Sequence, residues 1–499
     1  MVDFILERVG NIYTYCNTKD KSVIQKYLNT RILPKEYEKI KQLLDYHKNK
    51  DSKVLIIDDK DFDGTSCLVC CYNKLLKVWN TKTNLKIYNN HRHGVNETVL
   101  ASCSADSYDL VIILDSSTNL VELYKSNVTD YLVIDHHEPD MDIQNCTPDN
   151  VISCNSKLTK GLESISAGML TWLIFSEYTQ DFGDYEWAAT SLYSDIVPVD
   201  EVVADHIIQY FYGDLTKKQN FIGTQLEDTS KTKLQWGAIP LINYSRRLED
   251  DHTINLLVKG YDDYVLEYME KNRQVGKDIM KAMTYYRKID QSFNNFVCCD
   301  VSEINDFITE PVENFIGLFC NRLVSQYKKP AITFLKESED TIRFSVRSNH
   351  INSLDFFSKD NRVDGGGHQN ACGFTVNIED FKNVMQGYEE YLNPVNGQVQ
   401  YVLLEDILPV DDVSYLTEEL MKDIALYNEF AYSSTIPKII VQVSNVLPST
   451  VSQPTYNQIQ IKGCPWVIKG DKSKIDYDEF RLYLKLEDRN SLEFSIELC

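Results

Sequence analysis

The sequence lacks the features that would tie it to a membrane, to secretion or to an ATP-driven motor. None of its apolar runs approaches the roughly 20 residues that a transmembrane helix needs. Its first residues, Met1 to Arg8, do not pair a basic segment with an apolar one, so we expect no secretory signal and a cytoplasmic location. A Gly-x-x-x-x-Gly-Lys-Ser/Thr phosphate loop is also missing, which argues against an ATP motor.

Cysteine motifs and basic residues are also scarce. The 13 cysteines are scattered, odd in number and without a pair of Cys-x-x-Cys motifs, which predicts reduced and mostly inert thiols. We expect Cys70-Cys71 and Cys298-Cys299, which lie in apolar runs, to be buried in cores. Only 51 Lys and Arg stand against 74 Asp and Glu, and the net charge of −23 argues against a general nucleic-acid coat protein. A nuclease is compatible with this charge, because binding one strand needs only a local basic groove.

The length and the alternation of apolar segments predict several domains of α/β type. A chain of 499 residues is too long for one core, and short strands alternate with amphipathic stretches over 52–210, as in a doubly wound parallel sheet. We expect two α/β lobes joined by a long helix, followed by a β-rich domain like an oligonucleotide-binding (OB) barrel. The predicted divisions are a helical segment at 1–50, the first α/β domain at 51–255, the connecting helix at 256–292, the second α/β domain at 293–394 and the OB-like domain at 398–499.

Three strand patterns in the first domain end in acidic residues. The runs 54–57, 110–114 and 131–134 are rich in Val, Ile and Leu, as in parallel strands covered on both faces. Because the carboxyl ends of parallel strands meet at one edge of a sheet, we expect the acidic tips to converge. The tip residues are Asp59, Asp61, Asp63, Asp115, Asp135, His136 and His137. Carboxylates with an imidazole are typical ligands of Mn²⁺ or Mg²⁺.

Simpler interpretations compete with a metal site at these tips. In extended chain Asp59, Asp61 and Asp63 point the same way, and three carboxylates on one face repel unless a cation lies among them. An isolated segment of this kind is more often a solvated acidic turn. Here Gly64 and a helix predicted at 67–78 follow, which favours a phosphate-binding turn between strand and helix. A single His at a strand end is usually structural, whereas two in a row after Asp favour a functional role.

A glycine cluster in the second α/β domain is the other strong signal. Gly365, Gly366 and Gly367 precede His368, and three glycines in a row allow a ligand to approach the backbone closely. Arg347 ends a predicted strand upstream and could form a bidentate clamp on phosphate. The simpler alternative is a tight loop before a strand.

In this order the motifs resemble those of the DHH phosphoesterase superfamily and, within it, those of RecJ-type single-strand exonucleases. The resemblance rests on Asp61-Phe62-Asp63-Gly64, Asp115, Asp135-His136-His137 and Gly366-Gly367-His368. The segment Leu192 to Pro198 is similar to the fourth metal-binding motif, and Pro240 to Leu248 is similar to a strand-binding segment. The resemblance identifies the first α/β domain as a DHH catalytic domain and the second as the DHH-associated substrate-binding domain.

The resemblance also implies a site with two ions, Mn²⁺ or Mg²⁺, that hydrolyses a phosphodiester. The implied metal ligands are Asp59, Asp61, Asp63, Asp115, His136 and Asp195. The implied catalytic residues are Asp61, Asp63, Asp115, His136, His137 and Asp195. The implied substrate contacts are His137, Asn243, Arg247, Arg347, Gly366, Gly367 and His368.

The sequence departs from the RecJ pattern at several positions. Leu241 stands where the family has Arg and Arg246 where it has Gly, which alters the predicted strand-binding segment. Ser116-Ser117 follow Asp115 where relatives often have Cys or Asn and then Gly. The triple glycine and the segment 345–348 are instead similar to the nano-RNase and cyclic-dinucleotide branch.

Three functions are compatible with these residues. The first is a metal-dependent exonuclease that degrades single-stranded DNA from 5′ to 3′ in replication, recombination or repair. The second is a phosphodiesterase for very short RNAs or cyclic dinucleotides. The third is a non-catalytic replication or repair scaffold, which the intact motif residues make the least favoured. By analogy with RecJ relatives, a single-strand-binding protein or a helicase could be a partner in a bacterial or phage-infected cell.

Overall fold

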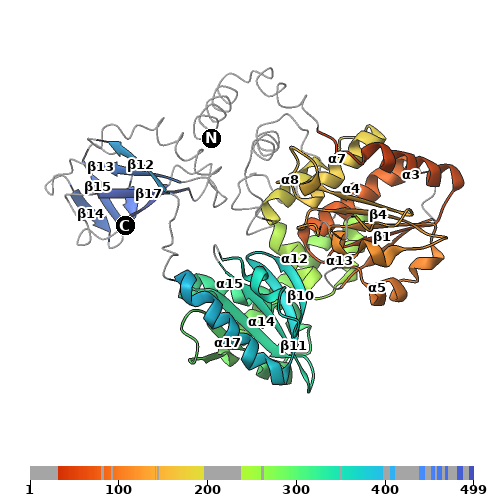
Figure 1. Ribbon diagram of the computed structural model, residues 1–499. Coiled ribbons are helices and arrows are strands. Elements are labelled where there is room, and N and C mark those ends of the chain that lie inside the picture. The colour runs from red at the N-terminus through yellow and green to blue at the C-terminus, as the bar shows by residue number, and fades with distance from the viewer. Residues whose placement is uncertain are drawn as a thin grey trace.

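The computed structural model describes two α/β lobes and a separate set of C-terminal strands (Figure 1). The described residues are 32–79, 84–91, 94–140, 142, 145–195, 238–259, 263–348 and 351–396, together with short segments between 405 and 498. Most of the predicted N-terminal helical segment lies outside these ranges, and its described helix is α3 (Tyr37–Lys50). Within the described residues, no helix combines the length and the apolar character needed to span a bilayer.

The first lobe is built on a five-stranded sheet with order β2-β1-β3-β4-β5. All of its strand pairs are parallel, which confirms the predicted doubly wound sheet. Its strands are β1 (Val54–Asp58), β2 (Leu85–Asn89), β3 (Leu110–Leu114), β4 (Asp130–Asp135) and β5 (Val151–Asn155). The chain leaves β1 toward β2 and returns to β3 on the other side, so the direction of winding reverses between β1 and β3.

Both faces of this sheet are covered, which explains why its strands are continuously apolar. Alternation sends Leu110 and Ile112 of β3 into the core under the larger helices, and Val111 and Ile113 into the core on the opposite face. Each of these side chains is fully buried, which stabilises the fold by roughly 1.5–3 kcal/mol per residue. The first face carries α4 (Phe62–Val78), α7 (Ala167–Thr179) and α8 (Tyr185–Ser194). The second carries α5 (Glu97–Ser102) and the 3₁₀ turns Ala105–Ser107 and Thr118–Tyr124.

Three helices connect the lobes: α12 (Ile239–Arg247), α13 (Asp251–Lys259) and the long α14 (Asp263–Tyr286). The buried side chains of α12, such as Leu241 and Ile242, belong to the core of the first lobe, while Tyr244 packs on the core of the second. The same short helix therefore contributes to both cores.

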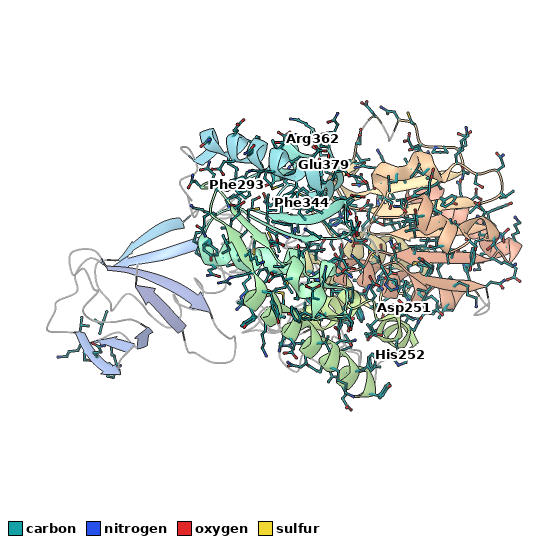
Figure 2. The ribbon with its side chains drawn as sticks, turned by 90° about the horizontal axis from the view of Figure 1, so that it is seen from below. Asp251, His252, Phe293, Phe344, Arg362 and Glu379 are labelled. Carbon is teal, nitrogen blue, oxygen red and sulfur yellow. The ribbon has the colours of Figure 1, made fainter. Side chains whose placement is uncertain are left out.

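The second lobe has a mixed six-stranded sheet with order β10-β11-β9-β8-β7-β6. Its strands are β6 (Lys288–Asp290), β7 (Val297–Asp300), β8 (Ala331–Lys336), β9 (Thr341–Arg347), β10 (Val363–His368) and β11 (Ala371–Asn377). Its helices are α15 (Ile316–Tyr327), α16 (Ser353–Phe357) and α17 (Ile378–Asn396), with 3₁₀ turns at Ser302–Asp306 and Val312–Asn314. Phe344 lies in the core of this lobe, while Arg362 lies near its surface (Figure 2).

The C-terminal strands form one seven-stranded sheet with order β12-β13-β17-β18-β16-β15-β14. They are β12 (Glu405–Val410), β13 (Lys438–Val443), β14 (Val451–Thr455), β15 (Gln458–Ile461), β16 (Val467–Lys469), β17 (Phe480–Leu486) and β18 (Phe494–Leu498). The residues that connect most of them lie outside the described ranges, so the OB-like barrel stays a prediction. The adjacent cysteines of both predicted pairs are buried in the two lobes, as expected.

A buried histidine anchors α3 to the sheet of the first lobe. His47 is 1% exposed, and its two ring nitrogens lie 2.9 Å from Ser52 Oγ and 3.0 Å from Asp130 Oδ2. Burial lowers the pKa of His47 although Asp130 raises it, so the neutral ring is favoured. The neutral ring fits this geometry, because one nitrogen can donate to Asp130 while the other accepts from Ser52.

We predict that His47 makes the metal-free protein less stable in mild acid. Because the folded pKa is lowered, the unfolded chain binds the proton more readily, and the stability from this residue is lost as the pH falls below the usual His range. The measurement is urea unfolding at pH 7.5 and pH 5.5 for the wild type and His47→Gln. The variant should cost about 1 kcal/mol at pH 7.5, and the difference should shrink at pH 5.5. A difference that grows at pH 5.5 would contradict the assignment.

Candidate metal-dependent active site

The acidic tips of the parallel strands lie along one edge of the first sheet. Asp58 ends β1, Asp115 directly follows β3, Asp135 ends β4 and Asn155 ends β5. This edge includes the point where the winding reverses between β1 and β3, which is where open α/β sheets bind their ligands.

Seven acidic and histidine side chains meet at this edge. Their ligand atoms form three overlapping groups, each within 4.8 Å: Asp115, His136 and His137; Asp63, His136 and Asp195; Asp59, Asp61 and Asp115. The Nε2 atom of His136 lies 2.9 Å from Asp195 Oδ2 and 3.4 Å from Asp115 Oδ1. The Oδ2 atom of Asp63 lies 3.7 Å from the same nitrogen, so His136 lies between carboxylates from three different elements. The structure brings together all six predicted metal ligands, with His137 beside them.

Asp63 belongs to the cluster, but the direction of its side chain differs from the one that the extended-chain argument predicted. That prediction is wrong, because α4 begins at Phe62, five residues before the predicted start, and places Asp63 in its first turn. Gly64 permits this turn, since a side chain there would meet the backbone oxygen of Asp59 at 2.3 Å. Asp61 is the N-cap of α4 and accepts from the amide of Gly64. Asp59 and Asp61 therefore share one group with Asp115, and Asp63 belongs to another.

The N-terminus of α7 holds Asp63, a contact that the sequence did not reveal. The carboxylate of Asp63 accepts hydrogen bonds from Ala167 N (2.9 Å) and Gly168 N (2.8 Å). A helix N-terminus favours an anion through its free amides and its dipole. A side chain on Gly168 would approach Asp63 Oδ1 to 2.7 Å, so glycine is needed there. The only signal in the sequence was Ser166, a residue type common at the N-cap of a helix, followed by Ala167-Gly168.

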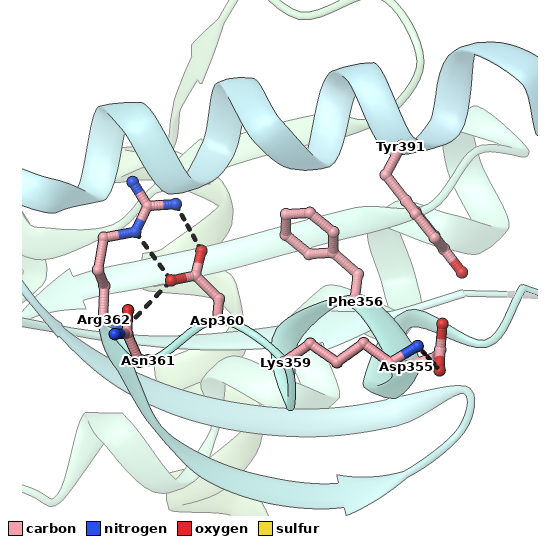
Figure 3. A pocket seen from close by; sticks show the side chains of 7 residues that line it. All are labelled: Asp355, Phe356, Lys359, Asp360, Asn361, Arg362 and Tyr391. Carbon is pink, nitrogen blue, oxygen red and sulfur yellow. Dashed lines mark hydrogen bonds and ion pairs between the residues drawn. The ribbon is translucent and has the colours of Figure 1, made fainter.

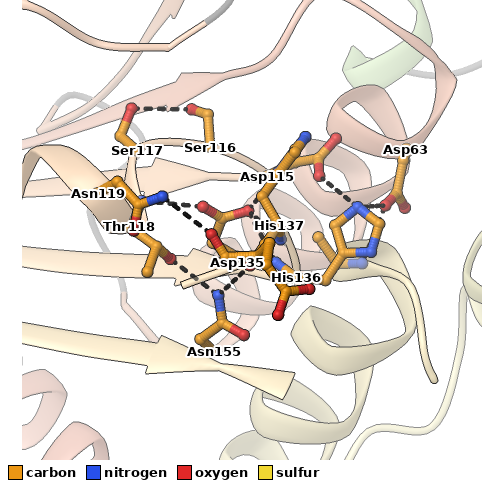
Figure 4. Close-up of polar contacts among 12 residues, drawn as sticks. Asp63, Asp115, Ser116, Ser117, Thr118, Asn119, Asp135, His136, His137 and Asn155 are labelled. Atoms are coloured by element: carbon orange, nitrogen blue, oxygen red, sulfur yellow. Dashed lines mark hydrogen bonds and ion pairs between the residues drawn. The ribbon is translucent and has the colours of Figure 1, made fainter. Parts of the chain in front are cut away.

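Asp135 orients the two histidines that follow it (Figure 4). Its Oδ1 accepts from the backbone amides of His136 (2.7 Å) and His137 (3.1 Å), and lies 2.6 Å from His137 Nδ1. Its Oδ2 accepts from Thr118 N at 2.9 Å. Burial alone would raise the pKa of Asp135, but His137 holds this pKa well below its usual range. With its oxygens used in this way, Asp135 orients the site and does not belong to any of the three groups of possible ligands.

The electrostatics of the cluster fit bound divalent cations. Burial raises the pKa of Asp63 and Asp115 well above the usual value, and neighbouring carboxylates raise it further. Among the described residues, none donates a hydrogen bond to the buried Oδ1 of Asp115. Crowded, desolvated carboxylates are stabilised by a cation, and oxygen ligands with imidazole suit Mn²⁺ or Mg²⁺. The residues present therefore fit divalent metals.

Arg247, one of the predicted substrate contacts, interacts electrostatically with both lobes. Burial lowers the pKa of Arg247, Asp61 of the first lobe raises it and Arg347 of the second lobe lowers it. The guanidinium of Arg347 donates to Ser345 Oγ and to Val346 O, both at 2.8 Å, and lies against Gly317. In the described part of the chain, no carboxylate oxygen lies within 4.0 Å of Arg347. Asn243, on the same helix as Arg247, has a buried Oδ1 that receives no hydrogen bond from the described residues.

The glycine cluster lies in a strand and not in the tight loop that the simpler alternative predicted. Gly365, Gly366 and Gly367 lie in β10, which pairs with β11 through a turn at Gln369-Asn370. Gly367 has φ +138°, and a side chain there would meet Ala371 O at 2.6 Å, so close strand pairing requires the glycine. A side chain on Gly366 would meet nothing within 4 Å. The backbone of His368 ends β10, but its side chain lies outside what the structure describes.

Arg246 is turned into the protein, away from any path for a strand. It is 3% exposed, its Nη2 lies 3.2 Å from Asp58 Oδ2, and it donates to the backbone oxygen of Asp59 at 2.9 Å. Arg246 therefore holds the backbone that carries the first acidic motif. This explains physically why Arg can replace Gly in a segment that was predicted to bind DNA.

A hollow of about 560 Å³ lies elsewhere in the second lobe, between α16 and α17 (Figure 3). Phe356 and Tyr391 line it, and its charges pair with one another, Arg362 with Asp360 and Lys359 with Asp355. Because these charges are already neutralised within the lobe, the hollow offers no free ionic group to a phosphate.

Comparisons with known proteins agree with this architecture. Residues 53–194 match the N-terminal domain of the DHH family, and residues 313–393 match the DHHA1 domain. RecJ in complex with Mn²⁺ from Thermus thermophilus has a TM-score of 0.70 at 15% identity, covering 94% of this chain and 71% of that one. Exonuclease RecJ bound to manganese has a TM-score of 0.56 at 16% identity, covering 74% of this chain and 98% of that one.

A third similar structure is the DHH domain of a member of the s1p family of ribosomal proteins, with a TM-score of 0.54 at 12% identity, covering 77% of this chain and 98% of that one. No curated protein matches the chain in sequence. At these identities the solved structures show a common fold. The two matched domains and the Asp/His cluster show that the chain is a metal-dependent phosphoesterase of the DHH/DHHA1 type.

We predict that Asp195→Asn separates metal binding from folding. Removing one carboxylate relieves repulsion on Asp63, so the metal-free variant should melt at the wild-type temperature or above it. Saturating Mn²⁺ at about 100 times its Kd stabilises a protein by about 2.7 kcal/mol, and the variant should lose most of this gain. Thermal melts in EDTA and in MnCl₂ measure both effects. Asp355→Asn, in the hollow of the second lobe, is the matched control and should keep the full shift. A full shift in Asp195→Asn would contradict the site.

Proposed function

We propose that this phosphoesterase is a two-metal exonuclease that degrades single-stranded DNA from the 5′ end. The observation that supports it most is the opposition of charges at the lobe junction: a buried cluster of carboxylates and imidazoles in the first lobe, and the guanidinium of Arg247, whose pKa is affected both by Asp61 of that cluster and by Arg347 of the second lobe. A phosphodiester in this space would have cations on both sides. The fold likeness to RecJ extends over 94% of the chain, beyond the two lobes, which suits a substrate longer than a dinucleotide.

The proposed ligands are Asp59, Asp61, Asp63, Asp115, His136 and Asp195. A bound pair of divalent cations would polarise the phosphate and activate the attacking water. The protein's own residues orient the reactants. Asp135 fixes the ring of His137 through Nδ1, and Nε2 is the nitrogen proposed to contact a phosphate oxygen. Burial alone would lower the pKa of His137, but Asp135 raises this pKa to about 10. The ring is therefore protonated at neutral pH.

Arg347 is suited to a second phosphate contact. Its guanidinium is already oriented by Ser345 Oγ and by the backbone, so little conformational entropy is lost when it binds. Arg347, at the end of β9, pairs with Ala371 of β11, which pairs in turn with His368 at the end of the glycine strand β10. Arg347 and the glycine strand therefore reach the same end of the second sheet.

A second candidate, hydrolysis of very short RNAs or cyclic dinucleotides, is favoured by Leu241. This residue is apolar and buried where the RecJ pattern has an arginine, so one side chain that could bind a long strand is missing from the segment 240–248. A series of substrates from two to about fifty nucleotides separates the two candidates. A preference for dinucleotides over long strands would support the second.

The decisive experiment for the first candidate uses end-labelled strands with blocked 5′ or 3′ ends, single or double, in Mn²⁺ and in Mg²⁺. We expect single strands to be shortened from a free 5′ end, and Asp61→Asn to be inactive with its fold retained. No hydrolysis of any length by the metal-loaded wild type would refute the proposed function. Equal digestion of double strands would refute its single-strand specificity.

The two neighbouring glycines provide a matched pair of variants. Gly366→Ala should change the free energy of unfolding by less than about 0.5 kcal/mol, because its side chain would meet nothing. If a substrate backbone approaches this strand, the same variant should raise KM roughly tenfold. Gly367→Ala should instead destabilise the fold by about 1–3 kcal/mol, because it strains the backbone against Ala371. Urea unfolding and steady-state kinetics test both. Unchanged KM in Gly366→Ala would remove Gly366 from the substrate site.

A further inference from the structure

The residue between two proposed metal ligands reaches into the other lobe. Lys60 lies between Asp59 and Asp61 in the sequence, but the hydrogen-bond partners of its Nζ lie outside the acidic cluster. It is 6% exposed, and its Nζ donates to Asn314 Oδ1 at 2.7 Å and to His91 O at 3.2 Å. Asn314 belongs to the second lobe, 254 residues further along the chain. A buried ammonium is costly unless its hydrogen bonds are made, so this lysine is stable in place only while the two lobes are together.

Asn314 is itself held by the connecting segment. Its Nδ2 donates to Arg247 O at 3.0 Å and to Glu249 Oε1 at 3.2 Å. Its side-chain oxygen and nitrogen are thus used in opposite directions, the oxygen toward Lys60 and the nitrogen toward the end of α12. An aspartate or a leucine could not make both sets of contacts, because each lacks the amide donor.

The residues that follow Asn314 lead directly to the proposed phosphate clamp. The ring of Phe315 stacks on Tyr244 of α12, with centroids 6.1 Å apart. Tyr244 packs in turn on Gly276 of α14, where a side chain would meet its ring at 2.1 Å. Gly317, three residues after Asn314, provides the space that the guanidinium of Arg347 occupies. A short, well-packed segment therefore joins the Lys60 contact to Arg347.

We propose that Lys60 and Asn314 form an interlobe latch that sets the distance between the acidic cluster and Arg347. Both residues are positioning residues, because neither faces the cluster itself. The functional consequence of the latch rests on the proposed function: the latch determines how well a substrate phosphate bound to the second lobe reaches the acidic cluster of the first lobe. Its structural part, the fixed separation of the lobes, is independent of any activity.

The test compares Asn314→Ala, Lys60→Met and the double variant with the wild type. Asn305→Ala is the matched control, since Asn305 donates one hydrogen bond, to Lys336 O, within the second lobe. Spin labels replace Glu138 in the first lobe and Lys359 in the second, both exposed, through a non-natural amino acid that leaves the cysteines untouched. Double electron–electron resonance then gives the distribution of interlobe distances.

We expect one narrow distribution for the wild type and for Asn305→Ala, and a broader or shifted one for both latch variants. The double variant should be no broader than the single ones, because either substitution breaks the same contact. With oligonucleotide substrates, Asn314→Ala should raise KM roughly tenfold and change kcat by less than about twofold. Circular dichroism checks that each variant is folded.

The outcomes separate the latch from the proposed function. Distance distributions identical to the wild type in both latch variants would overturn the latch, whatever the enzyme does. A kcat that falls as much as KM rises would overturn its positioning role. If the wild type hydrolyses nothing, the proposed function fails, and the resonance data still decide whether the latch exists. If Asn314→Ala does not fold, Lys60→Met alone decides.

Discussion

The structure depends on the burial of several carboxylates at one edge of a parallel sheet. Asp63 and Asp115 are almost fully buried and lie close to Asp195 and His136. Placing ionised carboxylates together in a poorly solvated site is unfavourable unless positive charge compensates it. The protein supplies part of this compensation permanently, through the amides at the start of α7 and through the His137–Asp135 pair. The remainder is what a divalent cation would provide, so the fold and the metal requirement have the same physical origin.

The distribution of positive charge follows from the same constraint. Arg246 is placed under the first motif, where it pairs with Asp58 and binds the backbone of Asp59. Arg247, the next residue on α12, instead interacts electrostatically with Asp61 and with Arg347, which change its pKa in opposite directions. Consecutive helical residues point about 100° apart, so one turn of α12 serves two tasks. One arginine stabilises the acidic motif from behind, and the other is proposed to contact a substrate phosphate.

The sequence predicted those parts of the fold that depend on local pattern. The apolar runs, their parallel pairing and the convergence of Asp115 and His136 follow from strand periodicity and from the geometry of parallel sheets. The direction of Asp63 did not follow, because the start of α4 depends on the contact of Gly64 with the backbone of Asp59. The contact between Asp63 and α7 was also hidden, since it joins residues that are 104 and 105 positions apart. No single sequence shows such pairs.

Glycine shows most clearly why pattern alone is insufficient. Three adjacent glycines were interpreted through one property, the absence of a side chain, and predicted either to let a ligand approach the backbone closely or to form a tight loop before a strand. In the structure, Gly365 and Gly367 are required by the close antiparallel approach of β11, which is a matter of folding. Among the described residues Gly366 has no such reason, because a side chain there would meet none of their atoms within 4 Å. The absence of an internal steric reason is itself informative, since a position that tolerates a side chain in the free protein but carries none is where a ligand can come closest to the backbone.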